Sequence, residues 1–290
     1  MRHTTKLRDI LGRRGILMLP GIYDAFTAKI AVRAGFECLY MTGSGSSTSL
    51  LGRPDVGLLT MTEMTNNAAR IVYSVNVPVI ADADTGYGNA MNMIRTIEEY
   101  ERAGVAGVHI EDQVLPKKCG HMEGKRLVSI EEMIGKIRAA TDSRRDQDFL
   151  IIARTDARSV LGFEEAVKRG RLYAEAGADM IFGEALQSKE ELAEYARLVR
   201  APLFTDSTEW GKTPVLSAKE LEELGYKIVV FSTAALRVVY KAVEELMEEI
   251  KLKGTQIGLL DRMKTRQETY ELLEYSKFQQ LEGQYLLPER

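Results

Sequence analysis

The segment ERAGVAGVHIED, residues 101–112, joins the end of a predicted helix to a buried strand through a single glycine. The same joint recurs in VRAGFECLYMTG (32–43), AEAGADMIFGEA (174–185) and EELGYKIVVFST (222–233). Glycine at this position supplies the left-handed residue that stops a helix. Four copies of one helix–glycine–strand joint indicate a fold built by repeating a strand and a helix.

Short apolar runs of the kind that form buried parallel strands recur along the chain. They are residues 16–20, 38–42, 78–84, 107–112, 149–156, 180–185, 202–206 and 227–232. Segments with helical periodicity lie between them, such as 129–141, where Ser129 and Glu132 fit a capping box. Eight strands alternating with helices favour an α/β fold, a (β/α)₈ TIM barrel made by residues 1–290 as a single domain. A doubly wound sheet would want a GxGxxG turn, and GSGSS at 43–47 lacks that spacing.

The carboxyl-terminal part of the chain is longer than a barrel requires. A helix is predicted over about 234–252, followed by GTQ and another helical stretch through Tyr275. Residues 234–290 therefore form a C-terminal helical extension. Two interpretations stay open for it: a cap packed on the barrel, or an oligomerisation arm.

Composition excludes several classes of protein. The net charge of −3 gives no basic excess for nucleic acid, and no Lys/Arg run forms a polybasic arm. No apolar segment approaches the roughly 18 residues that a membrane span needs. The charged amino-terminus has no apolar core, so it is not a signal peptide. Two cysteines far apart make neither a disulfide framework nor a zinc cluster. These features predict a soluble, reduced, cytoplasmic protein.

In a TIM barrel the catalytic groups lie at the carboxyl ends of the strands. The predicted ends carry Tyr40, Thr42, Asp82, Asp84, His109, Glu111, Asp112, Arg154, Asp156, Glu184, Asp206 and Ser232. So many acids on one rim repel one another unless a cation compensates. Asp82 and Asp84, two apart on one strand, point to the same side and with Glu111 predict a compact three-carboxylate cluster. Such a cluster suits Mg²⁺ before Mn²⁺; caps and ion pairs are the alternative for each acid alone.

Other groups near this rim allow more than one interpretation. The backbone of GSGSS (43–47) could form an anion nest, or a plain strand-to-helix turn. Arg154 suits a carboxylate clamp and could also neutralise the acidic rim. Asp55 could face the mouth, although a cap for the following helix is the better interpretation. Cys38 is expected to be a packing residue, and His109 a satisfied core histidine.

The loop KKCGHMEGK, residues 117–125, follows the fourth predicted strand. One cysteine and one histidine are only half of a tetrahedral metal site, and the phosphate-loop pattern GxxxxGK[ST] is absent. What remains is a mobile lid that carries Cys119 as an acid/base or nucleophilic thiol. Lys117, Lys118 and a charged His121 would lower the pKa of Cys119. A surface loop with an incidental cysteine is the alternative.

Four motifs together carry a family resemblance: DADTGYGNA (82–90), GVHIEDQVLPKKCGHMEGK (107–125), IIARTDAR (151–158) and TEWGKTP (208–214). In this order and spacing they resemble the isocitrate lyase/phosphoenolpyruvate mutase superfamily, over about residues 5–280. The similarity is closest to the short-chain branch that includes 2-methylisocitrate lyase. The resemblance implies a barrel whose eighth helix is exchanged with a neighbouring subunit, usually in a homotetramer.

The resemblance also implies a Mg²⁺-dependent carbon–carbon lyase acting on a 2-hydroxy di- or tricarboxylate. The closest reaction is cleavage of 2-methylisocitrate to pyruvate and succinate. Asp84 would bind Mg²⁺, and Asp82 and Glu111 would hold its waters. Cys119 would protonate the departing carbanion. The base stays open between Tyr40 and a water or carboxylate of the cluster.

The resemblance implies a substrate site with two parts, one for each half of the substrate. Backbone N–H groups of Thr42, Gly43 and Ser44, with Arg154 and nearby Asp55, would hold the 2-oxo-acid half. The second half would meet Gly120, His121, Glu184, Arg237 and the position of Asp206.

Three departures from the 2-methylisocitrate lyase pattern fall on that second half. Asp206 stands where those lyases have Asn, Gly183 where they have Pro, and Ser232 lies where they have a Tyr-Pro pair. The reaction type is therefore predicted more firmly than the substrate. A 2,3-dimethylmalate lyase, an oxaloacetate decarboxylase or hydrolase, and a carboxyphosphonoenolpyruvate phosphonomutase stay as alternatives, although a thiol acid argues against the mutase.

Overall fold

The eight predicted strands form one closed parallel barrel in the computed structural model, which describes residues 1–286. In chain order they are β1 (Leu17–Ile22), β2 (Leu39–Met41), β3 (Val79–Asp82), β4 (Gly107–Glu111), β5 (Leu150–Thr155), β6 (Met180–Gly183), β7 (Leu203–Asp206) and β8 (Ile228–Phe231). β1 pairs with β8, which closes the ring. The prediction of a (β/α)₈ TIM barrel with additional C-terminal helices is confirmed.

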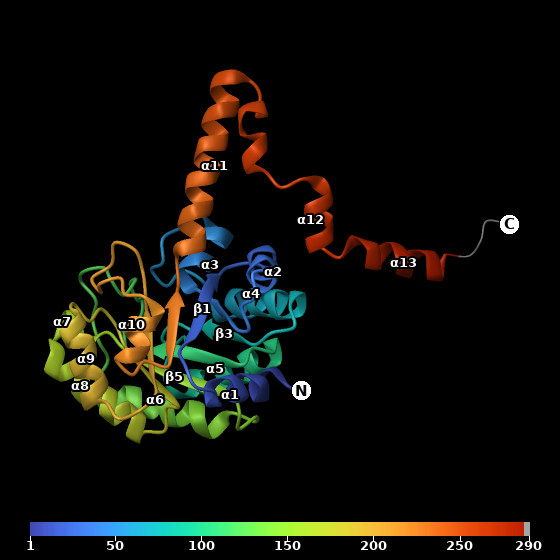
Figure 1. The fold of residues 1–290 in the computed structure, drawn as a ribbon. Helices are drawn as coiled ribbons and strands as arrows, with labels where there is room; N and C mark the ends of the chain where they lie inside the picture. The colour runs from blue at the N-terminus through green and yellow to red at the C-terminus, as the bar shows by residue number, and fades with distance from the viewer. Residues whose placement is uncertain (287–290) are drawn as a thin grey trace.

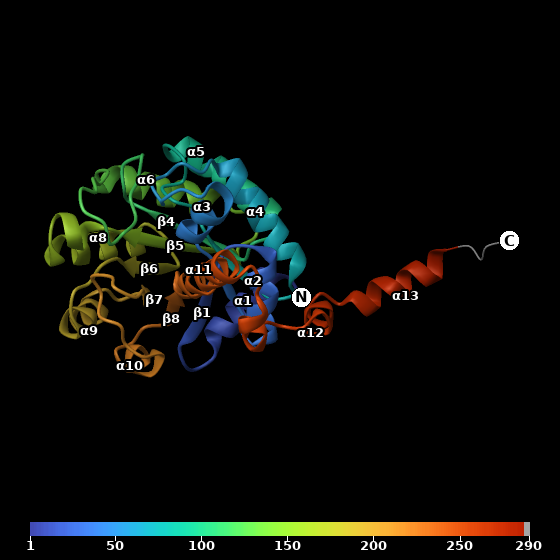
Figure 2. The ribbon, with the colours of Figure 1, turned by 90° about the horizontal axis from the view of Figure 1, so that it is seen from above.

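Helices surround the barrel as an outer ring (Figures 1 and 2). They are α1 (His3–Gly12), α2 (Ala25–Arg33), α3 (Gly43–Leu51), α4 (Met61–Ser74), α5 (Ala90–Ala103), α6 (Ile130–Ser143), α7 (Ala157–Val160), α8 (Phe163–Glu175), α9 (Lys189–Leu198) and α10 (Ala218–Glu223). Ser129 caps α6 by accepting from the backbone N–H of Glu132, as predicted. The return half of that capping box is not formed.

The repeated glycine joints have the expected backbone. Gly35, Gly104, Gly177 and Gly225 have φ angles of 97°, 83°, 110° and 97°, a region open to glycine at little cost. Each joint lets a helix stop and the chain turn directly into a buried strand. Inside the ring, side chains from alternating strand positions fill the barrel, among them Leu19, Ile80, Ile152, Phe204 and Val230. A second apolar layer lies between the strands and the helices.

One local prediction at the rim is wrong. β3 ends at Asp82, and Asp84 has a φ of 48°, so the alternation of a strand does not extend to Asp84. The GSGSS segment, for which an anion nest and a plain strand-to-helix turn stayed open, is helical. It forms the first five residues of α3, and Thr42 caps the helix by accepting from the backbone N–H of Gly45.

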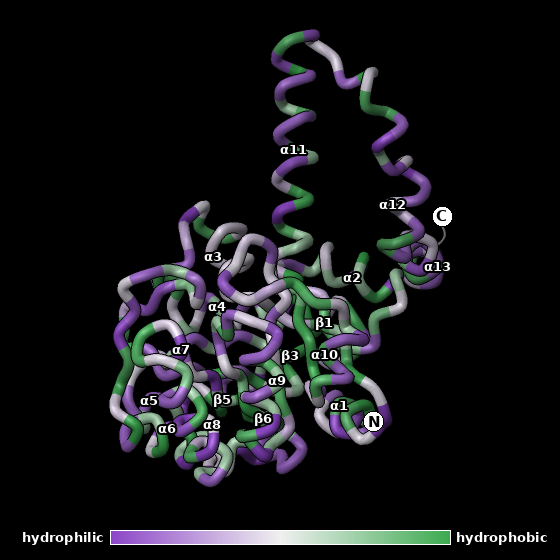
Figure 3. Tube along the Cα trace, turned by 60° about the vertical axis from the view of Figure 1, so that its left-hand side comes forward, coloured by the Kyte–Doolittle hydropathy of each residue, from purple (hydrophilic) through white to green (hydrophobic). Residues whose placement is uncertain are grey.

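The C-terminal extension rises from the mouth of the barrel and then leads away from it (Figure 1). It consists of α11 (Ala234–Lys253), a 3₁₀ turn η1 (Ile257–Arg262), α12 (Arg266–Leu272) and α13 (Tyr275–Tyr285). Apolar and polar residues alternate along α11 (Figure 3), and Val238, Tyr240 and Met247 are 69%, 69% and 56% exposed. These three side chains of α11 are therefore not packed on the barrel. The role of the extension as an oligomerisation arm stays a prediction.

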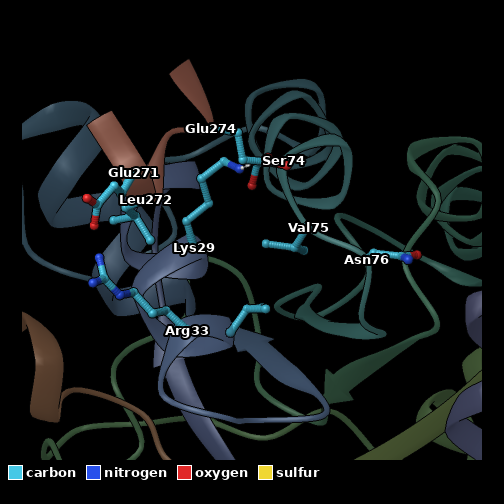
Figure 4. A pocket seen from close by; sticks show the side chains of 9 residues that line it. Lys29, Arg33, Ser74, Val75, Asn76, Glu271, Leu272 and Glu274 are labelled. Carbon is cyan, nitrogen blue, oxygen red and sulfur yellow. Dashed lines mark hydrogen bonds and ion pairs between the residues drawn. The ribbon is translucent and has the colours of Figure 1, made fainter. Parts of the chain in front are cut away.

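The arm returns to the barrel at α12. Lys29 Nζ of α2 lies 3.0 Å from Glu274 Oε2, and Arg33 donates to the carbonyl of Glu268. A cavity of about 510 Å³ lies between α2, the end of α4 and α12 (Figure 4). None of the residues that line this cavity belongs to a strand. Across residues 1–286, no helix combines the length and apolar character needed to cross a bilayer.

Candidate active site

A cavity of about 250 Å³ opens at the carboxyl ends of the strands, where a TIM barrel carries its chemistry. It brings together most of the residues that the sequence singled out. Its lining includes Tyr40, Thr42, Ser44, Asp55, Asp82, Cys119, Gly120, His121, Arg154, Phe182, Glu184, Asp206, Trp210, Ser232 and Arg237.

The rim carboxylates do not close into the compact cluster predicted from the sequence. Among residues 1–286, no three His, Cys, Asp or Glu side chains meet closely enough to hold an ion by themselves. Asp82 instead accepts hydrogen bonds from the backbone N–H groups of Asp84, at 2.9 Å, and Gly43, at 3.2 Å. Asp84 Oδ1 is buried beside the ammonium of Lys117, and both carboxylate oxygens of Glu111 are buried and accept no hydrogen bond within the described residues.

These buried oxygens fit a hard cation. Mg²⁺ is often held by one or two carboxylates and keeps several waters, so it does not need three direct protein ligands. Burial raises the pKa of Asp84 to about 7, against the opposing effect of Lys117, and burial also raises the pKa of Glu111. Lys117, 2.7 Å from Asp84 Oδ1, and Arg154, 3.4 Å from Glu111 Oε2, compensate these two charges only in part. Asp84, with Asp82 and Glu111 beside it, is the place where a divalent ion would supply the remaining charge.

Lys117 is the cation that the protein itself places at the rim. Its ammonium is almost fully buried and lies 2.7 Å from Asp84 Oδ1 and 2.6 Å from Asp55 Oδ1, as two ion pairs. The preferred interpretation of Asp55 as a helix cap is wrong, because Thr60 and Glu63 form the capping box of α4. Asp55 faces the mouth, and its ion pair with Lys117 holds the start of the lid against the mouth.

His109 is buried in β4, but it is more than a core residue. Its Nδ1 lies 2.8 Å from the hydroxyl of Tyr40 and 3.4 Å from Asp82 Oδ1, and its Nε2 faces Glu111 at 3.8 Å. Burial, and then the charge of Asp82, raise the pKa of the Tyr40 hydroxyl well above its usual range. Tyr40 is thus a phenol hydrogen-bonded to His109, which weighs against its role as the base.

The first turn of α3 points its backbone N–H groups toward the same mouth. Asp82 Oδ2 occupies one of them, that of Gly43, and a Cβ at Gly43 would lie 2.5 Å from that oxygen. Thr42 and Ser44 line the cavity beside it. The N–H groups of Gly45 and Ser46 also have partners, the hydroxyl and the carbonyl of Thr42. A helix amino-terminus of this kind favours bound anions.

Arg154 lies at the centre of the acidic rim. Its Nε and NH2 donate to the two oxygens of Asp156 at 2.9 and 3.0 Å. Its NH1 lies 3.4 Å from Glu111 Oε2, and Nε lies 3.6 Å from Glu184 Oε2. Arg154 therefore neutralises the acids around it and also presents a guanidinium to the cavity. These contacts agree with the neutralising role, and the role of carboxylate clamp stays a prediction.

The lid, residues 117–125, is folded over this cavity. Burial raises the pKa of the Cys119 thiol, in contrast to the lowering predicted from its neighbours. That prediction is wrong for identifiable reasons. Lys117 is directed to Asp55 and Asp84, and Lys118 is exposed and bonds to the carbonyl of Glu123. A thiol that keeps its proton is the form a general acid requires.

His121 connects the lid to the loop after β7. Its Nδ1 accepts a 3.0 Å hydrogen bond from the backbone N–H of Lys212, and its Nε2 faces Glu184 Oε1 at 3.2 Å. Burial lowers the pKa of His121, so the imidazole is neutral and not the cation expected beside Cys119. A Cβ at Gly211 would lie 2.9 Å from the imidazole, so glycine allows this close approach.

The second half of the cavity holds two of the three departures noted in the sequence. Asp206 accepts a 2.7 Å hydrogen bond from the hydroxyl of Ser232, and burial, followed by the charge of Glu184, raises the pKa of Asp206 to about 7. Gly183 faces the ring of Tyr195, since a Cβ there would lie 2.7 Å from Tyr195 Cζ. Packing against this tyrosine explains the glycine.

Arg237 lies at the outer edge of the same half. Its side chain is 5.2 Å from the ring centre of Trp210, and its Nε lies 3.4 Å from Glu209 Oε2. Trp210 and Glu209 belong to the TEWGKTP motif, but sequence reasoning gave neither of them a role. The motif itself was the available signal, because four of its residues, Thr208 among them, line the cavity.

The barrel and the cavity at its mouth are those of a (β/α)₈ enzyme. Residues 7–251 match the phosphoenolpyruvate phosphomutase family. The chain is 50% identical over 96% of its length to a 2-methylisocitrate lyase of Aeropyrum pernix, covering 89% of that protein. It is 48% identical over 98% of its length to a 2,3-dimethylmalate lyase of Eubacterium barkeri, covering 99% of it.

A solved structure agrees with this assignment. A phosphonopyruvate hydrolase in complex with oxalate and Mg²⁺ superposes with a TM-score of 0.89 at 32% identity, covering 99% of this chain and 100% of that one. The chain belongs to the isocitrate lyase/phosphoenolpyruvate mutase superfamily, and it is an enzyme of the lyase kind.

Proposed function

We propose that this protein is a Mg²⁺-dependent carbon–carbon lyase that releases pyruvate from a 2-hydroxy di- or tricarboxylate. The observation that carries the proposal is the juxtaposition of a protonated, lid-borne thiol, Cys119, with Asp82 and Arg154 around one small cavity. A general acid, an anion clamp and an acidic rim are the three parts that such a cleavage needs. Glyoxylate is the corresponding product if the substrate lacks a methyl group on the hydroxyl-bearing carbon.

Asp84, Asp82 and Glu111 are the residues that would hold the metal. Bound Mg²⁺ would acidify the substrate hydroxyl and neutralise its neighbouring carboxylate. The two buried oxygens of Glu111, which accept no hydrogen bond in the described residues, support this position. The relative solved with Mg²⁺ and oxalate supports the choice of ion.

The pyruvate half would lie against the amino-terminus of α3. Backbone N–H groups around Gly43 and Ser44 can donate hydrogen bonds to its carboxylate, and the guanidinium of Arg154 can bind the same fragment from the other side. A water or a carboxylate of the rim takes the hydroxyl proton, and the bond between the hydroxyl-bearing carbon and its neighbour then breaks. The electron pair of that bond passes to the neighbouring carbon, and the hydroxyl-bearing carbon becomes the ketone of pyruvate.

Cys119 completes the reaction on the other half. Its S–H proton passes to the new carbanion, which leaves a thiolate on the enzyme and a neutral carbon centre on the departing carboxylate. The closed lid excludes water, so that the carbanion is protonated by this thiol rather than at random. His121, neutral and directed toward Glu184, contributes a hydrogen-bond donor without adding another acid to the site.

Asp206 decides between the two substrates that the relatives name. When charged, it would repel the additional carboxylate of 2-methylisocitrate and would tolerate the methyl group of 2,3-dimethylmalate. Phe182 and Val230 line the same cavity and suit a methyl group. We therefore favour a dicarboxylate of the 2,3-dimethylmalate kind. 2-Methylisocitrate is the second candidate because Arg237 offers a cation at the edge of the pocket.

Assembly is a further part of the proposal. We propose that α11 packs against a second copy of this chain, in a tetramer with exchanged eighth helices, as the resemblance implied. The exposed apolar residues Val239, Val243, Met247 and Ile250 recur at intervals that place them on one side of the helix, and each is more than 40% exposed. A helix with such a stripe requires a partner surface.

A substrate panel tests the proposal directly. The protein is incubated with Mg²⁺ and, separately, with 2,3-dimethylmalate, 2-methylisocitrate, isocitrate and oxaloacetate, and release of a 2-oxo acid is followed. We expect pyruvate from at least one of the first two compounds. Failure to release a 2-oxo acid from every substrate, with Mg²⁺ binding shown independently, would refute the lyase function.

A further inference from the structure

Lys125, the last residue of the lid, buries its ammonium in the site although the proposed reaction gives it no role. The Nζ lies 2.6 Å from Asp156 Oδ1, in an ion pair whose two side chains are 1% and 0% exposed. The same ammonium donates to the carbonyl of Gly120. A buried lysine with two such partners is costly to place, so its position invites a functional explanation.

We propose that Lys125 is the positioning residue of the general acid. It holds the lid closed by tying the backbone beside Cys119 to Asp156. The inference rests on the proposed function, because it takes Cys119 to be the proton donor. The contact between Lys125 of the lid and Asp156, at the carboxyl end of β5, supports this role.

Lys125 binds the lid at Gly120, where the backbone of the lid contacts side chains of the site. Gly120 follows Cys119 directly, and a Cβ on it would lie 2.3 Å from Arg154 NH2 and 2.4 Å from Glu184 Oε1. The backbone therefore lies against these two side chains with no room for another atom. The Cys119 carbonyl accepts a 2.9 Å hydrogen bond from the N–H of Met122, which makes residues 119–122 a tight turn. Fixing the Gly120 carbonyl consequently fixes the thiol.

Asp156, the ion-pair partner of Lys125, is itself held rigidly. It is fully buried, and its backbone N–H donates to Asp112 Oδ1 at 2.9 Å. Asp112 is held in turn by Thr155, Arg169 and Tyr173. Because this network lies between β4, β5 and α8, Asp156 has little freedom to follow a moving lid.

The same carboxylate also orients Arg154. Asp156 Oδ1 accepts from both Lys125 Nζ and Arg154 NH2, and Oδ2 accepts from Arg154 Nε. One carboxylate thus positions the proton donor, through Lys125, and the anion clamp, through Arg154. Closure of the lid and correct placement of the guanidinium are coupled at this residue.

The other anchors of the lid act elsewhere and leave this role to Lys125. At its base, Gln113 pairs with Leu127, and the side chain of Gln113 exchanges hydrogen bonds with the backbone of Lys118. On its outer side, Lys212 holds His121. At its start, Lys117 pairs with Asp55 and Asp84. None of these contacts reaches the Gly120 carbonyl.

Alkylation of Cys119 by iodoacetamide measures this role without requiring turnover. Cys38, the other cysteine, is fully buried, so it does not compete for the reagent. Wild type is compared with Lys125→Met, Lys125→Gln and the control Lys118→Met, which alters an exposed lysine of the same loop. Rates are measured across pH, because only the plateau rate separates access to the thiol from a change in its pKa.

Loss of a hydrogen bond to a charged group corresponds to a change of about 10- to 100-fold. We expect Lys125→Met to raise the plateau alkylation rate by about that factor and to lower kcat comparably, with the Kd for Mg²⁺ close to that of wild type. Lys125→Gln, which keeps one donor, should be intermediate, and Lys118→Met should match wild type. Circular dichroism and the fluorescence of the single tryptophan, Trp210, check that each variant is folded.

The two proposals fail in different ways. Unchanged alkylation in folded Lys125→Met and Lys125→Gln, with normal wild-type turnover, would overturn the positioning role alone. Faster alkylation together with no 2-oxo-acid release by wild type would overturn the lyase and leave Lys125 as the residue that holds the lid. A fall in thermal stability without any change in alkylation or kcat would assign Lys125 a purely structural role.

Discussion

The carboxylate of Asp206 accepts a 2.7 Å hydrogen bond from the hydroxyl of Ser232 inside the candidate active site. These two residues come from the ends of β7 and β8, and both depart from the 2-methylisocitrate lyase pattern. Two unusual residues in direct contact are more informative than either alone, because the serine hydroxyl stabilises a carboxylate where a neutral amide is usual. The pair therefore defines the half of the pocket in which the substrate is chosen.

Asp206→Asn should improve the use of a tricarboxylate. Removing the negative charge abolishes its repulsion of the additional carboxylate and supplies an amide donor in its place. We expect kcat/KM for 2-methylisocitrate relative to 2,3-dimethylmalate to rise by about tenfold or more, the scale of one hydrogen bond to a charged group. Ser232→Ala is the control, since it removes the hydroxyl and keeps the carboxylate. An unchanged ratio in Asp206→Asn would show that Asp206 does not select the substrate.

The same ratio should depend on pH in wild type. Burial raises the pKa of Asp206 to about 7, with Glu184 adding to the effect and Ser232 and Arg154 opposing it. Below that pH the side chain is neutral and can donate to a carboxylate; above it the charge repels one. The relative kcat/KM for 2-methylisocitrate should therefore fall as pH rises through about 7. Asp206→Asn should give a flat ratio, and a wild-type ratio without pH dependence would contradict this assignment.

Cys119→Ser should lose most turnover and keep ligand binding. A serine hydroxyl fits the site but is a far weaker acid, and general acid catalysis contributes about 10²- to 10⁴-fold. We expect kcat to fall within that range, while calorimetry shows Mg²⁺ and pyruvate binding close to wild type. Cys38→Ser, in the barrel wall, is the matched control for a change of thiol. Near-normal turnover in Cys119→Ser would exclude the thiol as the proton donor.

Asp84→Asn should weaken Mg²⁺ binding by at least about tenfold, as the loss of a ligand charge should cost no less than an outer hydrogen bond to a ligand. Chelation of the metal should abolish turnover, and adding back Mg²⁺, or Mn²⁺, should restore it. Titration calorimetry gives the affinity without any need for activity. Asp206→Asn serves as the control, because it removes a buried carboxylate from the other side of the same cavity. Equal Mg²⁺ affinity in wild type and Asp84→Asn would place the metal elsewhere.

Charges on the apolar stripe of α11 should dissociate the oligomer. The double variant Val243→Lys and Met247→Lys puts two ammonium groups on exposed apolar positions of the arm. Sedimentation equilibrium should then report a smaller assembly than for wild type. Glu248→Lys, an exposed change on the same helix, should leave the mass unchanged. A wild-type protein that is already monomeric would rule out the exchanged-helix arrangement.

The local pattern of the chain determined much of this protein. Strand positions, the glycine joints and the order of β1 to β8 follow from periodicity and from backbone preferences that act over a few residues. The acids and Arg154 at the strand ends could be assigned to one mouth, because in a parallel barrel all carboxyl ends meet there. The resemblance in the lid and rim motifs added specific roles, with Cys119 as the acid that protonates the carbanion and Asp84 as the residue that binds Mg²⁺.

Tertiary structure alone decided how those groups are charged and paired. The sequence could not show that Lys117 would lie between Asp55 and Asp84, that Lys125 would reach Asp156, or that burial would keep the proton on Cys119. Burial and electrostatic pairing depend on residues that are distant in the chain and meet only when the barrel closes. Local sequence therefore fixes where a side chain emerges, and the closed barrel fixes its protonation and its partners.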